Sequence, residues 1–265
     1  MTRKSYPSDI SRENFAQIEP LLRSVWRSTK PIKLDLYEVF CAVLYLLRTG
    51  CQWRYLPPQF PKWRSVYAYW RKWSEPDEHG VSVLQQALKK SVGAVRERLG
   101  RSACSAFLIV DAQSVKNADT AGLKGYDAGK KVSGIKRHIA VDTLGLPHAV
   151  AITTAEVTDR QGALAAFKRC KSSMGQIQSL LADGGYTGAP FAQGVKDILG
   201  EHVTVQIAKR SDLHSFRVMP KRWVVERSFA WLEKNRRLWK NCERWLNTSL
   251  QFVHLAFLAL VLRRS

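Results

Sequence analysis

Apolar positions follow one period upstream of residue 100 and another downstream of it. In the first hundred residues they recur every three or four positions, which is the period of an amphipathic helix. Pro57, Pro58 and Pro61 interrupt this pattern, because proline does not continue a helix. The pattern therefore predicts a small all-α domain over residues 1–100, with helices at residues 12–27, 34–48, 62–74 and 82–98.

Downstream of residue 100, short apolar runs alternate with segments of helical period. Short apolar runs bounded by turn signals are typical of buried strands, and their alternation with helices is typical of an α/β layer fold. We expect this fold to occupy residues 101–265. Strands are predicted at residues 107–111, 136–142, 148–153, 177–182 and 202–207, and helices at residues 160–171, 188–199 and from about 221.

The chain is strongly basic, which indicates a polyanionic partner. Its 265 residues carry a formal net charge of +20, and the sequence pI is near 10.0. Residues 1–100 hold 17 Lys and Arg against 9 Asp and Glu, and residues 101–265 hold 25 against 13. Cations that neutralise phosphates release condensed counterions and so supply most non-specific affinity for nucleic acid. A nucleic acid is therefore a better candidate partner than a membrane.

Other protein classes fit the sequence poorly. The five cysteines form no Cys-x-x-Cys pair, so we expect reduced thiols and no zinc site. The longest apolar stretch, residues 250–262, is shorter than the roughly 20 residues that span a bilayer, and predicts a helix packed on the core. No signal-peptide pattern opens the chain, so a cytoplasmic, chromosome-associated location is expected.

Three acidic residues stand in unusual settings for a charged side chain. Asp111 ends the apolar run 106–110 and Asp183 ends the segment 177–182, so both carboxylates are expected at the carboxyl ends of strands. Glu226 lies in a nearly all-apolar helical segment. Each acid alone has an ordinary explanation, since strand-end aspartates cap turns and Glu226 could belong to a ladder of ion pairs. That ladder would comprise Arg222, Glu226, Glu233 and Arg237.

Six short motifs are spread over most of the chain and are informative as a set. They are Cys-Gln-Trp-Arg-Tyr-Leu-Pro at 51–57, Tyr-Ala-Tyr-Trp-Arg-Lys-Trp at 67–73, Asp-Ala-Gln-Ser-Val-Lys at 111–116, Gly-Ile-Lys-Arg-His-Ile-Ala-Val-Asp-Thr at 134–143, Ala-Asp-Gly-Gly-Tyr at 182–186 and Trp-Val-Val-Glu-Arg-Ser-Phe-Ala-Trp-Leu at 223–232. The set resembles bacterial insertion-sequence transposases of the insertion sequence five family, which use DDE chemistry. Arg222 matches an Arg four positions before the glutamate of that family. Where related transposases have a Tyr seven positions before the glutamate and a Lys seven after it, this chain has Met219 and Glu233, with Lys234 one place off.

The resemblance implies a ribonuclease H-like fold, in which a mixed sheet flanked by helices follows a small helix-turn-helix-like domain. Asp111 would belong to the first strand, Asp183 to the fourth and Glu226 to an adjacent helix, together forming a catalytic triad. The three carboxylates would hold two Mg²⁺ or Mn²⁺ ions, with Asp111 shared by both. The 43 positions from Asp183 to Glu226 leave no room for an inserted domain.

The function that the resemblance implies is DNA transposition. Such a protein would bind the terminal inverted repeats of its insertion sequence in double-stranded DNA and nick the DNA at their ends. It would then join the freed 3′-hydroxyl to target DNA, with a homodimer bringing two ends together. Two alternatives remain open: a nuclease that cuts without joining, and a DNA-binding protein without enzymatic activity.

Cations along the chain are candidate contacts to that DNA. The helix predicted at residues 62–74 has aromatic side chains on one face and cations on the other. This pattern is typical of a DNA-docking helix, and equally of a core helix with an ordinary solvated face. The candidate DNA contacts are Arg64, Arg71, Lys72, Lys136, Arg137, Arg222 and Arg237.

Overall fold

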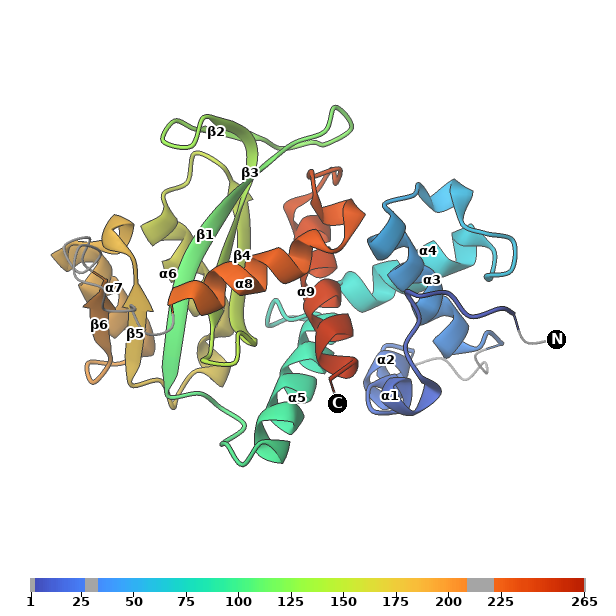
Figure 1. The fold of residues 1–265 in the computed structure, drawn as a ribbon, viewed down its shortest axis with the longest axis horizontal. Coiled ribbons are helices and arrows are strands. Elements are labelled where there is room, and N and C mark those ends of the chain that lie inside the picture. Colours follow the sequence, from blue (N-terminus) through green and yellow to red (C-terminus); the bar gives the residue numbers. More distant parts are fainter. Residues whose placement is uncertain (1–2, 27–32, 209–221, 265) are drawn as a thin grey trace. The chain divides into compact units, whose positions relative to one another are not determined.

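The computed structural model describes residues 3–26, 33–208 and 222–264, and the chain divides into two compact units (Figure 1). The first unit runs to Leu99 and also includes Leu232–Trp239 and the residues from Gln251 onward. The second comprises Gly100–Trp231 and Lys240–Leu250. Each unit is therefore built from segments that lie far apart in the sequence.

The junction at residues 99–100 coincides with the expected boundary, but the C-terminal segments depart from the division into residues 1–100 and 101–265. Most of helix α9, Leu246–Leu262, belongs to the first unit. Its Phe252 ring stacks on Trp70 with centroids 4.3 Å apart, and its Gln251 accepts a 2.7 Å hydrogen bond from Ser82. The closing apolar stretch thus completes the core of the helical unit. No described helix, α9 included, is long and apolar enough to cross a membrane.

The first unit follows the predicted helices with one break. The segment predicted as one helix at residues 12–27 forms two short helices, because Pro20, in the first turn of the second, lacks the N–H that a continuous helix needs. Arg27 itself lies outside the described residues. The helices of this unit are α1 Arg12–Ala16, α2 Glu19–Ser24, α3 Leu36–Thr49, α4 Trp63–Ser74 and α5 Val83–Arg98, with 3₁₀ turns η1 at Trp53–Tyr55 and η5 at Arg236–Leu238.

Helix α4 packs one face into the first unit and exposes cations on the other. Val66, Trp70 and Trp73 are buried, and the Trp73 indole donates a 2.9 Å hydrogen bond to the Leu22 carbonyl. The aromatic stripe is therefore mainly core. The exposed cations of the helix and of the residue before it are Lys62, Arg64, Arg71 and Lys72.

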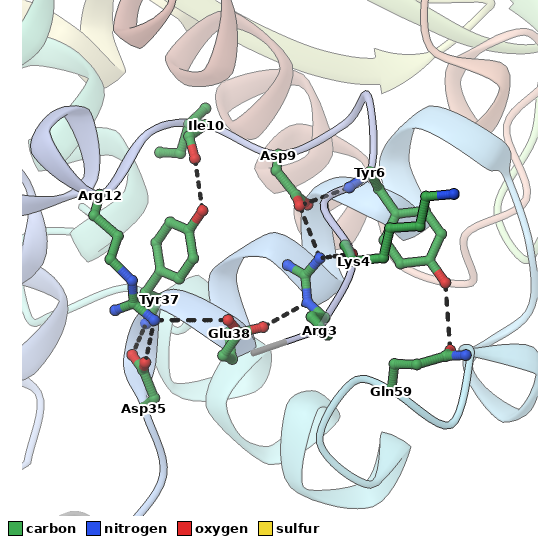
Figure 2. A network of polar contacts seen from close by, with 10 residues as sticks. All are labelled: Arg3, Lys4, Tyr6, Asp9, Ile10, Arg12, Asp35, Tyr37, Glu38 and Gln59. Atoms are coloured by element: carbon green, nitrogen blue, oxygen red, sulfur yellow. Dashed lines mark hydrogen bonds and ion pairs between the residues drawn. The ribbon is translucent and has the colours of Figure 1, made fainter. Parts of the chain in front are cut away.

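The residues before α1 are tied to the start of α3 by charged side chains (Figure 2). Arg3 lies 2.8 Å from Asp9 and 2.6 Å from Glu38, and only 7% of its side chain is exposed. Beside this inner pair of contacts, Arg12 lies 2.8 Å from Asp35, but there both side chains are about half exposed. The inner contacts are thus shielded from water and the outer one is not.

The described part of the second unit contains a mixed six-stranded sheet. Strands β3 and β4 continue antiparallel from one side of β1, whereas β5 and β6 run parallel to β1 on its other side. The short β2 pairs with the beginning of β3. The elements of this unit are β1 Phe107–Lys116, β2 Gly125–Asp127, β3 Val132–Val141, β4 Pro147–Thr154, α6 Asp159–Cys170, β5 Ser179–Ala182, α7 Ala189–Leu199, β6 Thr204–Ile207 and most of α8 Arg222–Glu233.

Helices cover both faces of this sheet. Strand β3 is buried at every position from Gly134 to Val141, which requires cover on both sides. Figure 1 shows α8 crossing in front of β1, with α6 behind the strands. Phe167 of α6 is fully buried in the core, and Ser228 of α8 donates a 2.9 Å hydrogen bond to the Gly145 carbonyl in the turn between β3 and β4. This packing fixes α8 against the sheet.

Strand β1 is longer than predicted, so Asp111 lies within the strand and not at its carboxyl end. The pairing with β3 continues to Lys116. The polar positions of the second half are accommodated because their side chains have partners: Gln113 accepts a hydrogen bond from Arg137 at 3.2 Å, and Ser114 donates one to Asp127 at 2.6 Å. The apolar run therefore marks only the first half of the strand.

Candidate active site

Two of the three acids meet where β5 ends beside β1. The parallel pairing of these strands sets Ile109 against Leu181. Continued by two positions, the register brings Asp111 opposite Asp183 on one face of the sheet, because residues two apart in a strand share a face. Asp183 directly follows the last residue of β5. Strand pairing therefore brings these two carboxylates together.

Asp111 is held in a setting that disfavours its charge. Burial raises the pKa of Asp111 to about 6, and the nearby charge of Asp183 adds to the rise. The backbone N–H of Ala112 donates to Asp111 Oδ1 at 2.7 Å, and the cations Lys130 and Arg222 also lower this pKa. These contacts only partly offset burial, so Asp111 holds its proton to an unusually high pH for an aspartate.

Asp183 has a partner for each carboxylate oxygen. Its Oδ1 accepts a 2.9 Å hydrogen bond from the Gly185 N–H, within the 3₁₀ turn η3 at Gly184–Tyr186. A Cβ on Gly185 would lie 3.0 Å from that oxygen, so a glycine here leaves the carboxylate room. The Oδ2 atom lies 3.4 Å from Arg222 Nη2. The turn after β5 thus orients Asp183 toward α8.

Glu226 is linked to this pair through Arg222. The two residues are one helical turn apart on α8, with Arg222 Nε 3.8 Å from Glu226 Oε1, while the same guanidinium contacts Asp183. The Glu226 side chain is 61% exposed. In the described parts of the chain, no three His, Cys, Asp or Glu side chains lie close enough together to hold a metal ion. The structure therefore brings Asp111 and Asp183 together, and an arginine bridges them to Glu226.

The two aspartates nevertheless have the donor chemistry of a divalent-cation site. Carboxylate oxygens are the ligands that Mg²⁺ and Mn²⁺ prefer in proteins. The charge of Asp183 raises the pKa of Asp111, and a bound cation would relieve that repulsion. Asp111 and Asp183 thus have the ligand chemistry that such an ion requires.

Comparison with known proteins identifies the family to which this arrangement belongs. Residues 102–262 match the family described as "Transposase DDE domain", and residues 10–78 match "Putative transposase of IS4/5 family". The chain belongs to the IS4/5 family of DDE transposases. The first match includes Asp111, Asp183 and Glu226, together with the whole sheet.

A curated relative of this transposase comes from Burkholderia cepacia. It is described as "Putative transposase for insertion sequence element IS402", and it is 34% identical over 134 residues. The matched region is 48% of this chain and 60% of the relative. The chain therefore spans less than two thirds of the relative that it matches.

Lys130 lies beside Asp111 of the transposase, although no sequence pattern indicates it. Its Nζ donates a 3.0 Å hydrogen bond to the carbonyl of Ala112, next to Asp111, and lies 3.7 Å from Asp159 Oδ2. The turn between β2 and β3 carries it, and Asp127 accepts a 3.1 Å hydrogen bond from its backbone N–H. The Asp-Ala-Gly-Lys turn is visible in the sequence, but no pattern shows that it lies beside Asp111.

Lys136 and Arg137, two of the predicted DNA contacts, are buried, which contradicts their expected place on a DNA-facing surface. They are 5% and 2% exposed. Lys136 Nζ lies 3.1 Å from Asp127 and 2.9 Å from Asp159. Burial lowers the pKa of Lys136, but hydrogen bonds to these two carboxylates outweigh it and raise the pKa above its ordinary value. Both cations therefore lie in the buried region around the sheet, where they contribute to its stability.

The predicted polar stripe through Glu226 ends before Arg237. Helix α8 stops at Glu233, so Arg237 lies on a different element, the 3₁₀ turn η5 of the first unit. There its guanidinium lies 4.4 Å from the Phe252 ring centroid and donates a 3.2 Å hydrogen bond to the Cys51 carbonyl. Arg237 thus contributes to packing in the helical unit. Met219, the other position noted near this stripe, lies outside the described residues.

The three predicted contacts on α4 are exposed but differ in their partners. Arg71 lies 3.3 Å from Glu75, and Lys72 Nζ lies 5.0 Å from the ring centroid of Trp26. Arg64, like Lys72, has an aromatic neighbour, the ring of Trp63. Contact of these residues with DNA stays a prediction.

Proposed function

We propose that this transposase cuts and joins DNA, with Asp111, Asp183 and Glu226 as its catalytic acids. The observation that carries the proposal is that Asp111 and Asp183 interact electrostatically beside the paired strands β1 and β5, while Arg222 links Asp183 to Glu226. The sheet, with antiparallel strands on one side of β1 and parallel strands on the other, supports a ribonuclease H-like fold for the catalytic unit.

The proposed reaction consists of two in-line displacements at phosphorus. In the first, a water oxygen bonds to the phosphorus at the end of the element, the P–O3′ bond breaks, and the end is left with a 3′-hydroxyl. In the second, that hydroxyl attacks a phosphate of target DNA and releases the 3′-hydroxyl of the target strand. Two Mg²⁺ or Mn²⁺ ions, when bound, would activate the attacking oxygen and neutralise the leaving one.

The three acids would differ in the number of metal ions that each one holds. Asp111, the most buried, would be shared by both, while Asp183 would hold one ion and Glu226 the other. Arg222 would release Glu226 and then be available to a DNA phosphate. Lys130 adds positive charge beside Asp111, where the anionic phosphate would lie.

The substrate that we infer is double-stranded DNA, both the terminal inverted repeats and the target. The formal charge of +20 favours such a partner through counterion release. The helical first unit, with exposed cations on α4, would bind the repeats as a helix-turn-helix-like domain. A homodimer would bring two active sites to the two ends of the element.

Cleavage of an end-labelled duplex carrying the element's own terminal repeat tests this function. The native protein is expected to nick the duplex with Mg²⁺ or Mn²⁺ and to stop when EDTA removes the ion. Asp183→Asn should cleave at least about 100-fold more slowly and bind the duplex as before. Asp197→Asn, on the exposed side of α7, is the matched control and should cleave normally. Undiminished cleavage by Asp183→Asn or Glu226→Gln would refute the assigned roles.

A second assay separates transposition from the two alternatives. A pre-nicked end duplex with a free 3′-hydroxyl is mixed with plasmid DNA and divalent cation, and joined product is measured. Joining is the expected result. Cutting without joining would identify a nuclease, and tight binding without cutting under any metal would identify a DNA-binding protein.

A further inference from the structure

Aromatic and cationic side chains gather at the start of α4 and on the neighbouring turn η1. Tyr55 is 72% exposed and Tyr67 is 41% exposed, although large aromatic side chains are usually well buried. The Trp53 ring meets Tyr67 edge-on, with centroids 5.1 Å apart. We call this surface the η1–α4 patch; its members are Arg54, Tyr55, Lys62, Trp63, Arg64 and Tyr67.

Two arginines from different elements share one indole ring within the patch. The Arg54 guanidinium, from η1, lies 5.5 Å from the ring centroid of Trp63, and the Arg64 guanidinium, from α4, lies 5.6 Å from it. Cation–π contacts of this kind orient a guanidinium without neutralising its charge. The ring therefore holds two full positive charges close together, each on a group that matches a phosphate in shape.

The patch lies in a stretch of the chain without acidic residues. None occurs between Glu38 and Glu75, although six Lys and Arg residues do. Within the described residues, no carboxylate forms an ion pair with the cations of the patch. At the other end of α4, by contrast, Arg71 lies 3.3 Å from Glu75. Unneutralised positive charge is thus concentrated at the beginning of the helix.

We propose that the η1–α4 patch is the surface on which duplex DNA docks. Its cations would contact neighbouring phosphates, and the exposed rings of Tyr55 and Tyr67 would pack against sugars or base edges. This inference rests on the proposed function and narrows it, because it places the contact at the beginning of α4 and on η1.

Two double variants that each remove two positive charges test the proposal. Binding of the complete chain to a labelled duplex carrying the terminal repeat is measured by fluorescence anisotropy over a range of salt, with EDTA present to prevent cleavage. Arg54→Gln/Arg64→Gln is expected to bind at least about tenfold more weakly at physiological salt, with the slope of log affinity against log salt reduced by about two. Lys89→Gln/Lys90→Gln, an equal change of charge at exposed positions of α5, is the matched control and should lose less than about threefold.

Two further variants separate charge from packing. Tyr55→Ala removes an exposed ring and no charge, so its affinity should fall about fivefold with the salt slope unchanged. Arg54→Lys/Arg64→Lys keeps both charges and should restore the slope. The thermal unfolding midpoint of each variant is measured as well. A loss of affinity is attributed to the changed side chains only where this midpoint is unchanged.

The outcomes distinguish failure of this inference from failure of the proposed function. Equal losses in the two double variants would overturn the patch as the docking surface while leaving DNA binding in place. Failure of the native protein to bind any duplex would overturn the proposed function itself. Tighter binding to single-stranded RNA or to anionic vesicles than to the duplex, lost in Arg54→Gln/Arg64→Gln, would overturn the assignment of duplex DNA.

Discussion

Arg222 holds together two carboxylates that belong to different elements. Its guanidinium lies 3.4 Å from Asp183 and 3.8 Å from Glu226, and both contacts are partly exposed to water. A guanidinium in this place supplies the positive charge that a divalent cation would otherwise supply. In the proposed function, the arginine and a divalent cation would therefore compete for the same acids.

The competition predicts tighter cation binding when the arginine is removed. In the absence of DNA, Arg222→Gln is expected to bind Mn²⁺ about tenfold more tightly than the native protein, as measured by titration calorimetry. Lys168→Gln, an equal change of charge at an exposed site on α6, should have little effect. Weaker Mn²⁺ binding by Arg222→Gln would show instead that the arginine organises the ligands.

The raised pKa of Asp111 predicts that its charge lowers the free energy of unfolding by an amount that depends on pH. The folded-state pKa is about 6 and the model-peptide value is 3.8. As the pH rises from about 4 through 6, the native protein therefore loses stability relative to a variant with an uncharged residue at position 111. Asp111→Asn keeps an oxygen for the Ala112 N–H. In EDTA it should be more stable than the native protein by on the order of 2 kcal/mol at pH 8, and by close to nothing at pH 4. Urea denaturation at the two pH values checks this, and an equal difference at both would contradict it.

At this scale the sequence predicted the proximity of two of the acids, but not the burial of two of the cations. Asp111 and Asp183 stand out because a carboxylate after an apolar run is conspicuous, and strand pairing then brings them together. Lys136 looks like a surface cation in the sequence because its carboxylate partners come from β2 and α6, nine and 23 positions away. Long-range pairing of that kind leaves no local pattern.

The segment before α1 shows how one element is fixed to another. Arg3 contacts Asp9 and Glu38 where water is largely excluded, whereas the contact of Arg12 with Asp35 is exposed to solvent (Figure 2). Removing one partner of a buried ion pair leaves the other charge buried and unpaired. The two arginines are therefore expected to differ greatly in their importance to the fold.

Arg3→Ala is expected to lower the free energy of unfolding by about 3 kcal/mol, because Asp9 and Glu38 would lose their shielded cation. Arg12→Ala removes the arginine at the start of α1, and it should cost less than about 1 kcal/mol, since exposed pairs contribute little. Guanidinium denaturation followed by tryptophan fluorescence measures both. Equal losses would mean that shielding from water does not set the strength of these contacts.

The boundaries of elements were less predictable than their existence. The helical segments of the first hundred residues all appear, but Pro20 divides the first of them. Strand β1 continues past its apolar run because Gln113 and Ser114 find polar partners across the sheet. The hydrophobic period alone predicts where apolar residues are buried. It cannot show where a strand continues because hydrogen bonds satisfy its polar residues.

At the scale of the whole molecule, each compact unit is assembled from separate stretches of chain. The first unit needs residues from Gln251 onward, since Phe252 stacks on Trp70 in its core. Sequence patterns detected the change near residue 100 because the period of the apolar positions shifts there. They could not show that a later helix returns to the first unit, because an all-apolar helix is equally suited to either core.

A fragment of residues 1–100 is therefore expected not to fold by itself. Without α9, Trp70 would lose the ring that covers it, and Ser82 would lose its buried partner Gln251. Near-ultraviolet circular dichroism and thermal melting should show no cooperative transition for the fragment. Addition of a peptide of residues 232–264 should restore one, and a cooperative transition of the fragment alone would contradict the expectation.

The discontinuity of the first unit also sets the order in which a ribosome completes the molecule. Residues 240–250, which finish the second unit, leave the exit tunnel before Gln251 and the residues after it. The sheet can thus be completed while the unit that begins the chain still waits for its last helix. A translation product that stops near residue 250 would carry Asp111, Asp183 and Glu226 but would lack a finished helical unit. Such a product would keep the proposed cutting residues, but the residues proposed to hold DNA would lie in a helical unit that lacks most of α9.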